Sequence, residues 1–427
     1  MLYHKPKPEA GSPWRRLFLL KAGEGPLVAW SMGYFFCLLS AYYLLRPLRE
    51  GMAIAKGADR LPWLMTATLG AMVLANPAFG ALVSRWPRFR FIPASTRFFA
   101  ASLLAFLALF RLLPAHGGAG LGYVFYVWLS VFNLFVVSVF WGFMGDLFNE
   151  EQGRRLFGLI AVGGTLGAIV GASATEALLQ GRFGLRLDGP WLLLVSVAVL
   201  ECAVQCMLRL GRMRRLAEAP PAREPGPGAL EGLRLLGRNP YLAWLCAYIL
   251  LFSLGSTLLY LQQGAIVAKA FPDQVSRTAA FARLDIWVNV LSLLLQLFFS
   301  GRIVSRLGVP ATLLLLPLLT FAGFGALAVW PVFAVLMAFQ VARRGLHYAV
   351  DRPARELIYI PLSPDEKYKS KPFIDTFVYR SGDLLGAWTP GALALVGIPM
   401  AAASLLGSAV WIGAAGWLGR SWRKARA

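Results

Sequence analysis

The chain has 427 residues, 58% of them hydrophobic, and a mean hydropathy of +0.60. This composition excludes a set of water-exposed globular domains and indicates a membrane protein. The formal net charge of +21 would suit a nucleic-acid-binding protein. The basic residues, however, lie between apolar segments, which does not indicate a nucleic-acid-binding protein.

Twelve apolar segments follow one another along the chain, and each is long enough to cross a hydrocarbon core of about 30 Å. We therefore predict an all-α membrane protein with twelve transmembrane helices. In chain order the segments cover residues 27–45, 61–83, 92–113, 121–144, 156–179, 189–208, 241–268, 279–299, 310–328, 331–350, 372–395 and 398–419.

The loops between these segments differ in charge. If the N-terminus lies in the cytoplasm, 30 of the 42 Lys and Arg residues fall in cytoplasmic segments and 9 fall in the opposite loops. This asymmetry follows the positive-inside rule, which accounts for the basic charge without a nucleic-acid partner. We expect both termini to be cytoplasmic and the chain to be a multi-pass protein of the bacterial inner membrane.

The chain divides into two similar halves. Residues 80–85, after the second segment, match residues 301–306, after the eighth, at an offset of 221, and glycines of the fifth and eleventh segments match at an offset of 219. Two matches at nearly equal offsets predict a six-plus-six duplication. The expected parts are a cytoplasmic tail (1–26), an N-terminal six-helix half (27–208), a cytoplasmic linker rich in Pro and Gly (209–240), a C-terminal six-helix half (241–419) and a second cytoplasmic tail (420–427).

The two matched segments both carry the pattern G-x-x-x-S-R. With the six-plus-six organisation, this pattern resembles the major facilitator superfamily, although Val83 and Val304 stand where that superfamily usually has an Asp. The resemblance implies a pseudo-symmetric bundle with a substrate site near the middle of the bilayer, between two rocking halves. It does not identify the substrate.

The cysteines and histidines indicate neither a metal site nor a catalytic centre. The four cysteines form no C-x-x-C pair, and the three histidines are scattered along the sequence. The apolar segments hold no Ser/His/Asp or H-E-x-x-H arrangement. We expect a transporter rather than an enzyme, with no metal and no cofactor.

Polar side chains inside the eighth segment mark a candidate site, because an intramembrane charge costs about 2.5–3.5 kcal/mol on insertion. Four of them recur every three or four residues and therefore share one helical face. They either line a cavity or hydrogen-bond to neighbouring helices. The four are Asp285, Asn289, Ser292 and Gln296. The fourth segment repeats the pattern more weakly, with Asn133 on one face with Tyr126 and Ser130.

The eleventh segment carries Arg380 and Asp383, which are three residues apart and can pair. Such a pair is either structural or a gate that opens when an anionic substrate competes for the arginine. The fifth segment has a small residue at every fourth position from Gly163 to Gly171. Because both flanks are membrane helix, this pattern indicates close helix packing rather than a phosphate-binding loop.

Two charged motifs carry a family resemblance. The first is Tyr43-Leu-Leu-Arg46-Pro-Leu-Arg49-Glu50, at the end of the first segment. The second begins at residues 353–362, Pro-Ala-Arg-Glu-Leu-Ile-Tyr-Ile-Pro-Leu, and continues at residues 367–375, Lys-Tyr-Lys-Ser-Lys-Pro-Phe-Ile-Asp. It is similar to P-T-[KR]-E-x-x-Y-I-P-L followed by K-x-K-x-K-x-x-I-D, so the chain resembles the nucleotide transporter family, the ATP:ADP antiporters of plastids and intracellular bacteria.

The resemblance implies exchange of nucleoside phosphates, and guanidinium groups suit phosphate because they bind it through two parallel hydrogen bonds. Arg46 and Arg49 are expected at the extracellular end of the first segment, with Arg49 in the place of a family lysine. The other basic residues of the motifs are expected at the cytoplasmic mouth. With the polar residues inside the segments, the predicted substrate-binding set comprises Arg46, Arg49, Asn133, Gln262, Gln263, Asp285, Asn289, Arg352, Arg355, Lys367, Lys369, Lys371 and Arg380. The predicted gating or coupling set comprises Glu50, Asp285, Glu356, Asp375 and Asp383.

The chain also departs from the family pattern. An acidic residue of the fourth segment is replaced by an apolar stretch around Leu129, and Gln262 and Gln263 occupy the corresponding place near the end of the seventh. The family's G-K-S-G lysine corresponds to Asp383, which reverses the sign of the charge. These departures indicate a divergent branch with a different substrate.

We predict a monomeric secondary transporter that moves an organic anion by alternating access. The preferred substrate is a nucleotide or another phosphorylated metabolite, and ATP/ADP exchange is the specific version. One alternative is a proton-coupled carrier of another solute, with Asp285 or Asp383 as the protonated group. The other is a membrane scaffold or sensor that keeps the fold without transport.

Overall fold

The structure is a computed structural model of the 427-residue chain. It describes residues 21, 23–55, 57–85, 88–113, 118–182, 184, 187–214, 240–359, 361, 362, 370 and 374–424. Lys367, Lys369 and Lys371 lie outside these residues, as does most of the predicted linker.

Helices make up both halves of the described chain, and each of the twelve predicted segments coincides with a helix or with abutting helical pieces. The first half holds α2 (Gly25–Ala53), the short η1 (Ala58–Arg60), α3 (Leu61–Arg85), α4 (Arg88–Leu112), α5 (Gly118–Leu147), α6 (Glu150–Gln180) and α7 (Trp191–Arg214). The second holds α9 (Pro240–Ala270), α10 (Gln274–Phe298), α11 (Ser300–Val329), α12 (Phe333–Leu346), η2 (His347–Asp351), α13 (Arg352–Ile358), η3 (Ile374–Val378), α15 (Tyr379–Leu395) and α16 (Met400–Lys424). Within the described residues, nine helices are long and apolar enough to cross a membrane.

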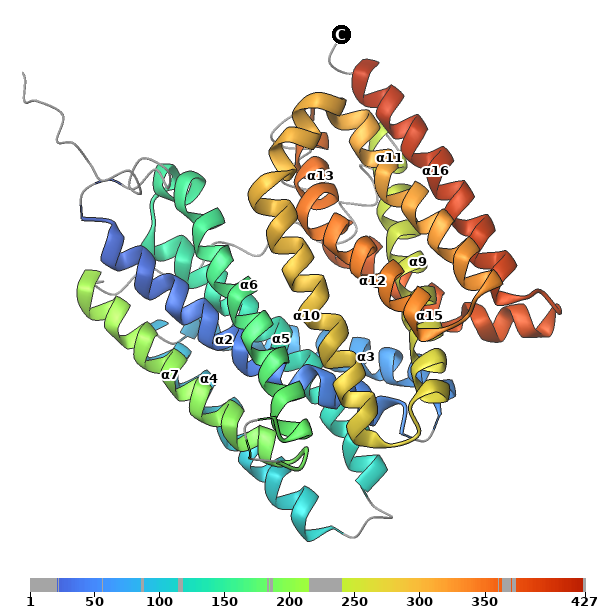
Figure 1. Ribbon diagram of the computed structural model, residues 1–427. Coiled ribbons are helices and arrows are strands. Elements are labelled where there is room, and N and C mark those ends of the chain that lie inside the picture. The colour runs from blue at the N-terminus through green and yellow to red at the C-terminus, as the bar shows by residue number, and fades with distance from the viewer. Residues whose placement is uncertain are drawn as a thin grey trace, which may run out of the picture.

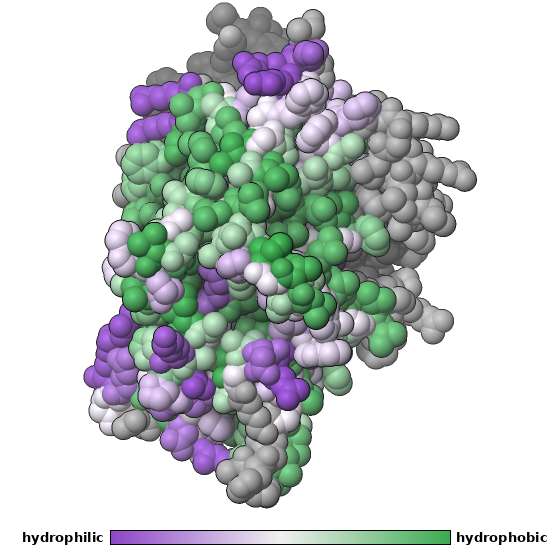
Figure 2. Space-filling model, turned by 90° about the vertical axis from the view of Figure 1, so that its right-hand side faces the viewer, coloured by the Kyte–Doolittle hydropathy of each residue, from purple (hydrophilic) through white to green (hydrophobic). Residues whose placement is uncertain are grey.

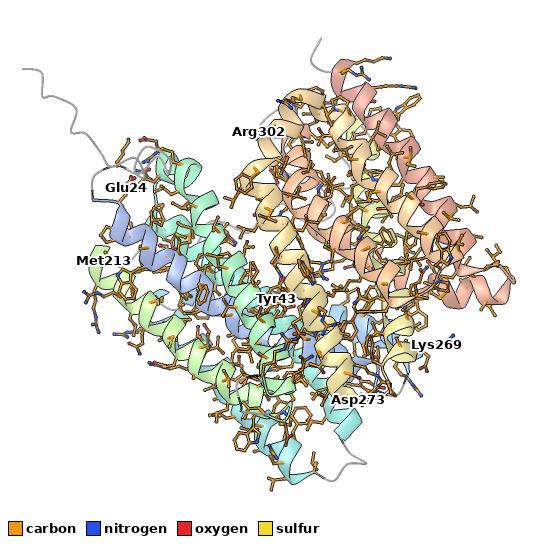
Figure 3. All side chains as sticks on the ribbon, viewed as in Figure 1. Glu24, Tyr43, Met213, Lys269, Asp273 and Arg302 are labelled. Atoms are coloured by element: carbon orange, nitrogen blue, oxygen red, sulfur yellow. The ribbon has the colours of Figure 1, made fainter. Side chains whose placement is uncertain are left out.

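The two halves form two bundles, and the described ends of the chain, at the start of α2 and at the end of α16, lie on the same side (Figure 1). Glu24, Met213 and Arg302 lie toward this side, here called the termini side, and Lys269 and Asp273 lie toward the opposite side (Figure 3). Figure 2 shows a broad hydrophobic band over one face, with hydrophilic residues above and below it. This distribution fits a bundle that spans a bilayer, with loops alternating between the two faces.

Glycines bring α6 against α2 and α15 against α9. A Cβ atom added at Gly163 would lie 2.5 Å from the backbone oxygen of Met32, and one added at Gly382 would lie 2.7 Å from that of Leu250. No side chain fits at such distances, so the small residues allow the backbones to approach each other. The predicted packing role of the Gly163–Gly171 stretch is confirmed, and the same contact recurs in the equivalent helix pair of the other half.

The N-terminus of α2 is fixed by an ion pair just outside the first span. Glu24 accepts hydrogen bonds from Arg155 at 2.9 and 3.2 Å and from the Gln152 amide at 3.1 Å. The hydrogen-bonded guanidinium of Arg155 lowers the pKa of Glu24 to about 2, even though burial acts in the opposite direction. The charged form of Glu24 therefore anchors α2 to α6.

The tenth predicted segment ends too early. The prediction placed its end at residue 350, but α12, η2 and α13 follow one another from Phe333 to Ile358. Hydropathy falls where the charged residues begin, yet the helical path continues because these side chains bind one another inside the bundle. The extension places Arg343 and Arg344 well inside the helical path instead of at its predicted cytoplasmic end.

Candidate functional site

A cavity of about 600 Å³ lies between the halves, lined by residues from α2, α3, α5, α9, α12, η2, α13 and α15. Among the described residues, six arginines and three carboxylates line it, and their formal charges sum to +3. These charged residues are Arg46, Arg49, Arg343, Arg344, Arg352, Arg355, Glu50, Glu356 and Asp383. Tyrosines and glutamines complete the wall, so the cavity is strongly polar.

One carboxylate joins arginines from both halves. Asp285 of α10 accepts hydrogen bonds on the same oxygen from Arg46 of α2, at 2.6 Å, and from Arg344 of α12, at 3.1 Å. Asp285 is 2% exposed, whereas both arginines line the cavity. Two guanidinium groups thus share one counter-ion, which leaves one positive charge uncompensated at the cavity wall.

A second cluster also crosses between the halves. Arg49 pairs with Glu50 and donates to the Ser130 hydroxyl at 2.9 Å. The Tyr260 hydroxyl of α9 donates to Glu50 at 2.5 Å and lies 2.9 Å from the hydroxyl of Tyr126. The end of α2 is therefore tied to α5 in its own half and to α9 in the other.

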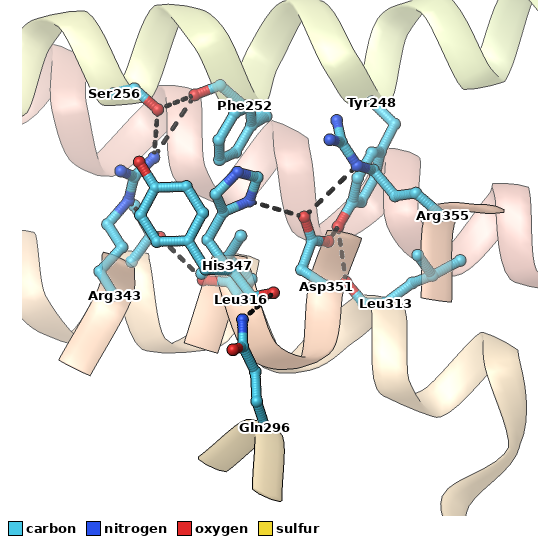
Figure 4. A network of polar contacts seen from close by, with 12 residues as sticks. Tyr248, Phe252, Ser256, Gln296, Leu313, Leu316, Arg343, His347, Asp351 and Arg355 are labelled. Carbon is cyan, nitrogen blue, oxygen red and sulfur yellow. Dashed lines mark hydrogen bonds and ion pairs between the residues drawn. The ribbon is translucent and has the colours of Figure 1, made fainter. Parts of the chain in front are cut away.

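A third cluster surrounds Asp351 (Figure 4). The Tyr248 hydroxyl donates to Asp351 at 2.5 Å, His347 Nδ1 lies 3.0 Å from its other oxygen, and Arg355 Nε lies 3.5 Å from that oxygen. The His347 ring stacks on Phe252, with 4.3 Å between the ring centroids. These contacts hold the η2 turn against α9 and orient Arg355 at the cavity wall.

A smaller cavity of about 210 Å³ adjoins the first and shares Arg49, Tyr126 and Asp383 with it. Arg380 and Asp383 form the ion pair that their spacing allows, at 3.3 Å. The second carboxylate oxygen of Asp383 accepts a hydrogen bond from Ser253 at 2.6 Å. The two cavities form one polar region that extends from Asn133 of α5 to α15.

The structure brings most of the predicted site residues to this region, although their roles remain predictions. Those that line the cavities are Arg46, Arg49, Glu50, Asn133, Gln263, Arg352, Arg355, Glu356, Arg380 and Asp383. Asp285 lies directly behind the lining. The predicted division into two basic mouths differs from the structure, since Arg46 and Arg49 line the same cavity as Arg352 and Arg355.

Three predicted site residues lie elsewhere or are described only in part. The amide of Gln262 donates to Ser404 at 3.2 Å, and neither residue is part of the cavity lining. Asn289 is buried, and its amide donates at 2.8 Å to the backbone oxygen of Asp285, one turn earlier. For Asp375 only the backbone is described, within η3.

Five residues of α12 and η2 were missed as site residues by the sequence reasoning. Gln340, Arg343, Arg344, His347 and Tyr348 line the large cavity. A signal was present, because Gln340, Arg344 and Tyr348 follow one another at intervals of four and thus share a helical face. In the described residues, no group of three or more His, Cys, Asp or Glu could hold a metal ion.

Comparisons with known proteins agree with this architecture. The nucleoside transporter NupG, in the crystal structure of a point mutant, superposes with a TM-score of 0.62 at 12% identity, over 93% of this chain and 99% of that one. A bacterial homologue of the human lysosomal transporter Spinster gives 0.60 at 14% identity, over 95% and 99%. At this level the likeness shows the fold alone, and it confirms the predicted major-facilitator-like bundle.

The sequence comparisons are more specific. ADP,ATP carrier protein 1 of Chlamydia muridarum is 22% identical over 85% of this chain and 80% of its own length. The protein of that name from Chlamydia trachomatis is 24% identical over 64% of this chain, and the match spans 58% of its length. The chloroplastic ADP,ATP carrier protein 1 of Arabidopsis thaliana is 24% identical over 83% of this chain and 66% of its own length. Residues 121–418 match the family described as TLC ATP/ADP transporter. The chain therefore belongs to the TLC ATP/ADP transporter family and is a multi-pass membrane transporter, not an enzyme.

Proposed function

We propose that this protein is a secondary transporter of a phosphorylated organic anion, and that nucleotides are its substrates. It works as a monomer by alternating access in the bacterial inner membrane, with both termini in the cytoplasm. The observation that carries the proposal is the surplus of arginine over carboxylate in the cavity between the halves.

The charge of the two cavities matches a phosphate-bearing substrate. Among the residues that the structure describes, seven arginines line them, and five carboxylates either line them or bind the lining arginines, so these residues carry a formal surplus of +2. A phosphate monoester carries a charge of about −1.5 to −2 at pH 7. A phosphorylated substrate therefore neutralises the site, whereas a neutral solute leaves the surplus buried in the bilayer.

The contacts between the halves support an alternating-access mechanism. On the side opposite the termini, the Trp63 and Trp388 rings pack edge to face at 4.7 Å, and the Trp388 indole donates to Thr66 at 3.1 Å. A separate contact between the halves is the ion pair of Arg283 in α10 with Glu176 in α6, at 3.0 Å. These contacts close one end of the site, and their rupture on rocking of the halves gives the substrate access from that end.

The nucleotide version draws on the names of the relatives, which are ADP,ATP carriers. Several tyrosines of the cavity wall offer aromatic surface for a nucleobase, while the arginines offer donors for phosphate. The substitution of Asp383 for a family lysine replaces a positive charge with a negative one. We therefore expect a substrate preference that differs from that of the carriers.

Uptake into proteoliposomes tests the proposal. Vesicles preloaded with unlabelled ADP or ATP are expected to accumulate labelled nucleotide above protein-free vesicles, and absence of uptake refutes the nucleotide version. Arg344→Gln is expected to lower uptake at least tenfold, because a hydrogen bond to a charged group contributes about 1.5–3 kcal/mol. The matched control is Arg97→Gln: Arg97 pairs with Glu201 at 2.8 Å, is half-exposed and does not line the cavity.

Asp383 supports a second candidate function, in which the protein is a proton-coupled carrier of another solute. Its carboxylate lines both cavities and binds Ser253, Thr257 and Arg380. Protonation would release Arg380 and change the charge of the wall. Solute uptake driven by a pH gradient, and lost in Asp383→Asn, would favour this function. The polar lining of the cavity argues against a scaffold without transport.

A further inference from the structure

Arg343 of α12 is a buried cation with neutral partners. Its side chain donates through Nε to the Thr320 hydroxyl at 3.2 Å, and through Nη2 to the Ser256 hydroxyl at 2.7 Å and the Phe252 backbone oxygen at 3.4 Å (Figure 4). The residue is 3% exposed. Across the described part of the chain, no carboxylate pairs with it.

The other buried arginines of the cavity differ in this respect. Arg46 and Arg344 share Asp285, and Arg49 pairs with Glu50. A buried charge without a counter-ion is costly, and an ionisable group inside a membrane protein is therefore kept for a function by default. The missing counter-ion of Arg343 is supplied most simply by the substrate.

Arg343 is also placed and fixed for such a contact. Its partners come from α9 and α11, so the side chain is clamped between three helices. The hydrogen bonds use Nε and Nη2, which leaves the two N–H groups of Nη1 on a residue that lines the cavity. One turn earlier, the Gln340 amide donates to Gln263 at 2.6 Å, and this pair extends the polar wall beside Arg343.

We propose that Arg343 forms a second anion subsite, which binds a phosphoryl group separate from the one bound by Arg46 and Arg344. Adjacent residues of an α-helix point about 100° apart, so Arg343 and Arg344 reach the cavity in different directions. A single phosphoryl group does not fill both subsites, but a diphosphate or longer chain does. The inference rests on the proposed function and adds Arg343 as the residue that receives the second of two linked phosphoryl groups.

Binding of inorganic phosphate and pyrophosphate to the purified full-length protein tests the subsite by calorimetry. The wild type is expected to bind pyrophosphate at least tenfold more tightly than phosphate. Arg343→Gln is expected to reduce this preference to within about twofold, with phosphate binding unchanged. Arg343→Lys keeps the charge but loses the planar fork, so about a threefold preference should remain. Arg97→Gln serves as the matched control and should behave as the wild type.

Three results would overturn the subsite. They are a wild type without preference for pyrophosphate, an Arg343→Gln variant that keeps the preference, and an equal loss of binding for both probes. If Arg343→Gln does not fold, the affinities of Arg343→Lys for phosphate and pyrophosphate are compared instead, and a preference as large as that of the wild type overturns the subsite. The proposed function fails separately. Nucleotide uptake without an Arg343-dependent preference for pyrophosphate refutes only the subsite. An Arg343-dependent preference for pyrophosphate without nucleotide uptake refutes only nucleotide transport.

Discussion

Asp285→Asn tests whether the shared carboxylate holds the two halves together. The substitution keeps the shape of the side chain but removes the charge that attracts Arg46 across the interface and Arg344 within the C-terminal half. Two unit charges about 4 Å apart attract by about 4 kcal/mol at an effective dielectric constant of 20. Loss of one partner of a buried pair costs about 3–5 kcal/mol, and 1.4 kcal/mol corresponds to a factor of ten. We expect the equilibrium to shift by about a hundredfold or more toward the state in which the halves separate on the side opposite the termini.

Thiol labelling at that interface measures the shift. Thr278 of α10 is 1% exposed and faces Gly51 of α2, where an added Cβ atom would lie 2.7 Å from the Thr278 hydroxyl. Thr278→Cys, in a background without the four native cysteines, reports opening through its reaction with a membrane-impermeant maleimide. Asp285→Asn should raise the labelling rate about a hundredfold, and Asp285→Glu should raise it far less.

The control for this experiment is Glu201→Gln, which removes the half-exposed partner of Arg97 within one half. It should leave the labelling rate unchanged. A rate in Asp285→Asn within twofold of the parent would refute the reasoning, because the charge would then contribute nothing to the contact between the halves.

Three further outcomes are expected. The pKa of Glu24 is lowered from 4.5 to about 2 by its ion pair with Arg155, so its stabilisation should be present above pH 4.5 and lost as the pH falls toward 2. The difference in thermal unfolding between wild type and Glu24→Gln, measured against pH, checks this. Gly167→Ala should prevent normal packing, because the added Cβ would collide with the Phe36 backbone oxygen, whereas Gly416→Ala has open space; monodispersity in detergent separates the two. Asp383→Asn should tighten pyrophosphate binding a few-fold by removing negative charge from the cavity wall, and weaker binding in calorimetry would contradict this charge argument.

The spans could be predicted because a bilayer imposes a strong and simple pattern. Each apolar run needs about 20 residues to cross the hydrocarbon core, and its backbone must form a helix there. The pattern failed at the end of the tenth span, where hydropathy cannot distinguish solvated charges from charges paired inside the protein. His347 and Asp351 lie one turn apart within one helical path, and each compensates for the polarity of the other.

The site was partly predictable for a related reason. The family motif pointed to Arg46 and Glu50, and charge inside a predicted segment pointed to Asp383; all three line the cavity. The predicted division of the basic residues into two mouths could not be corrected from the sequence, because it depends on how the two bundles tilt against each other. Arg343 was expected toward the cytoplasmic side because the fall in hydropathy ended the tenth predicted segment at residue 350, whereas the helical path continues to Ile358.

The π-helical turn of η2 affects how this family can diverge. A π turn holds one residue more than an α-helical turn, so the residues after it are rotated by about 100° relative to an unbroken helix. Removal of one residue between His347 and Asp351 would restore a regular helix and turn Arg352 and Arg355 away from the cavity, while α12 would keep its register. A single-codon deletion or insertion at this turn would therefore exchange the charges at the termini-side end of the cavity in one evolutionary step.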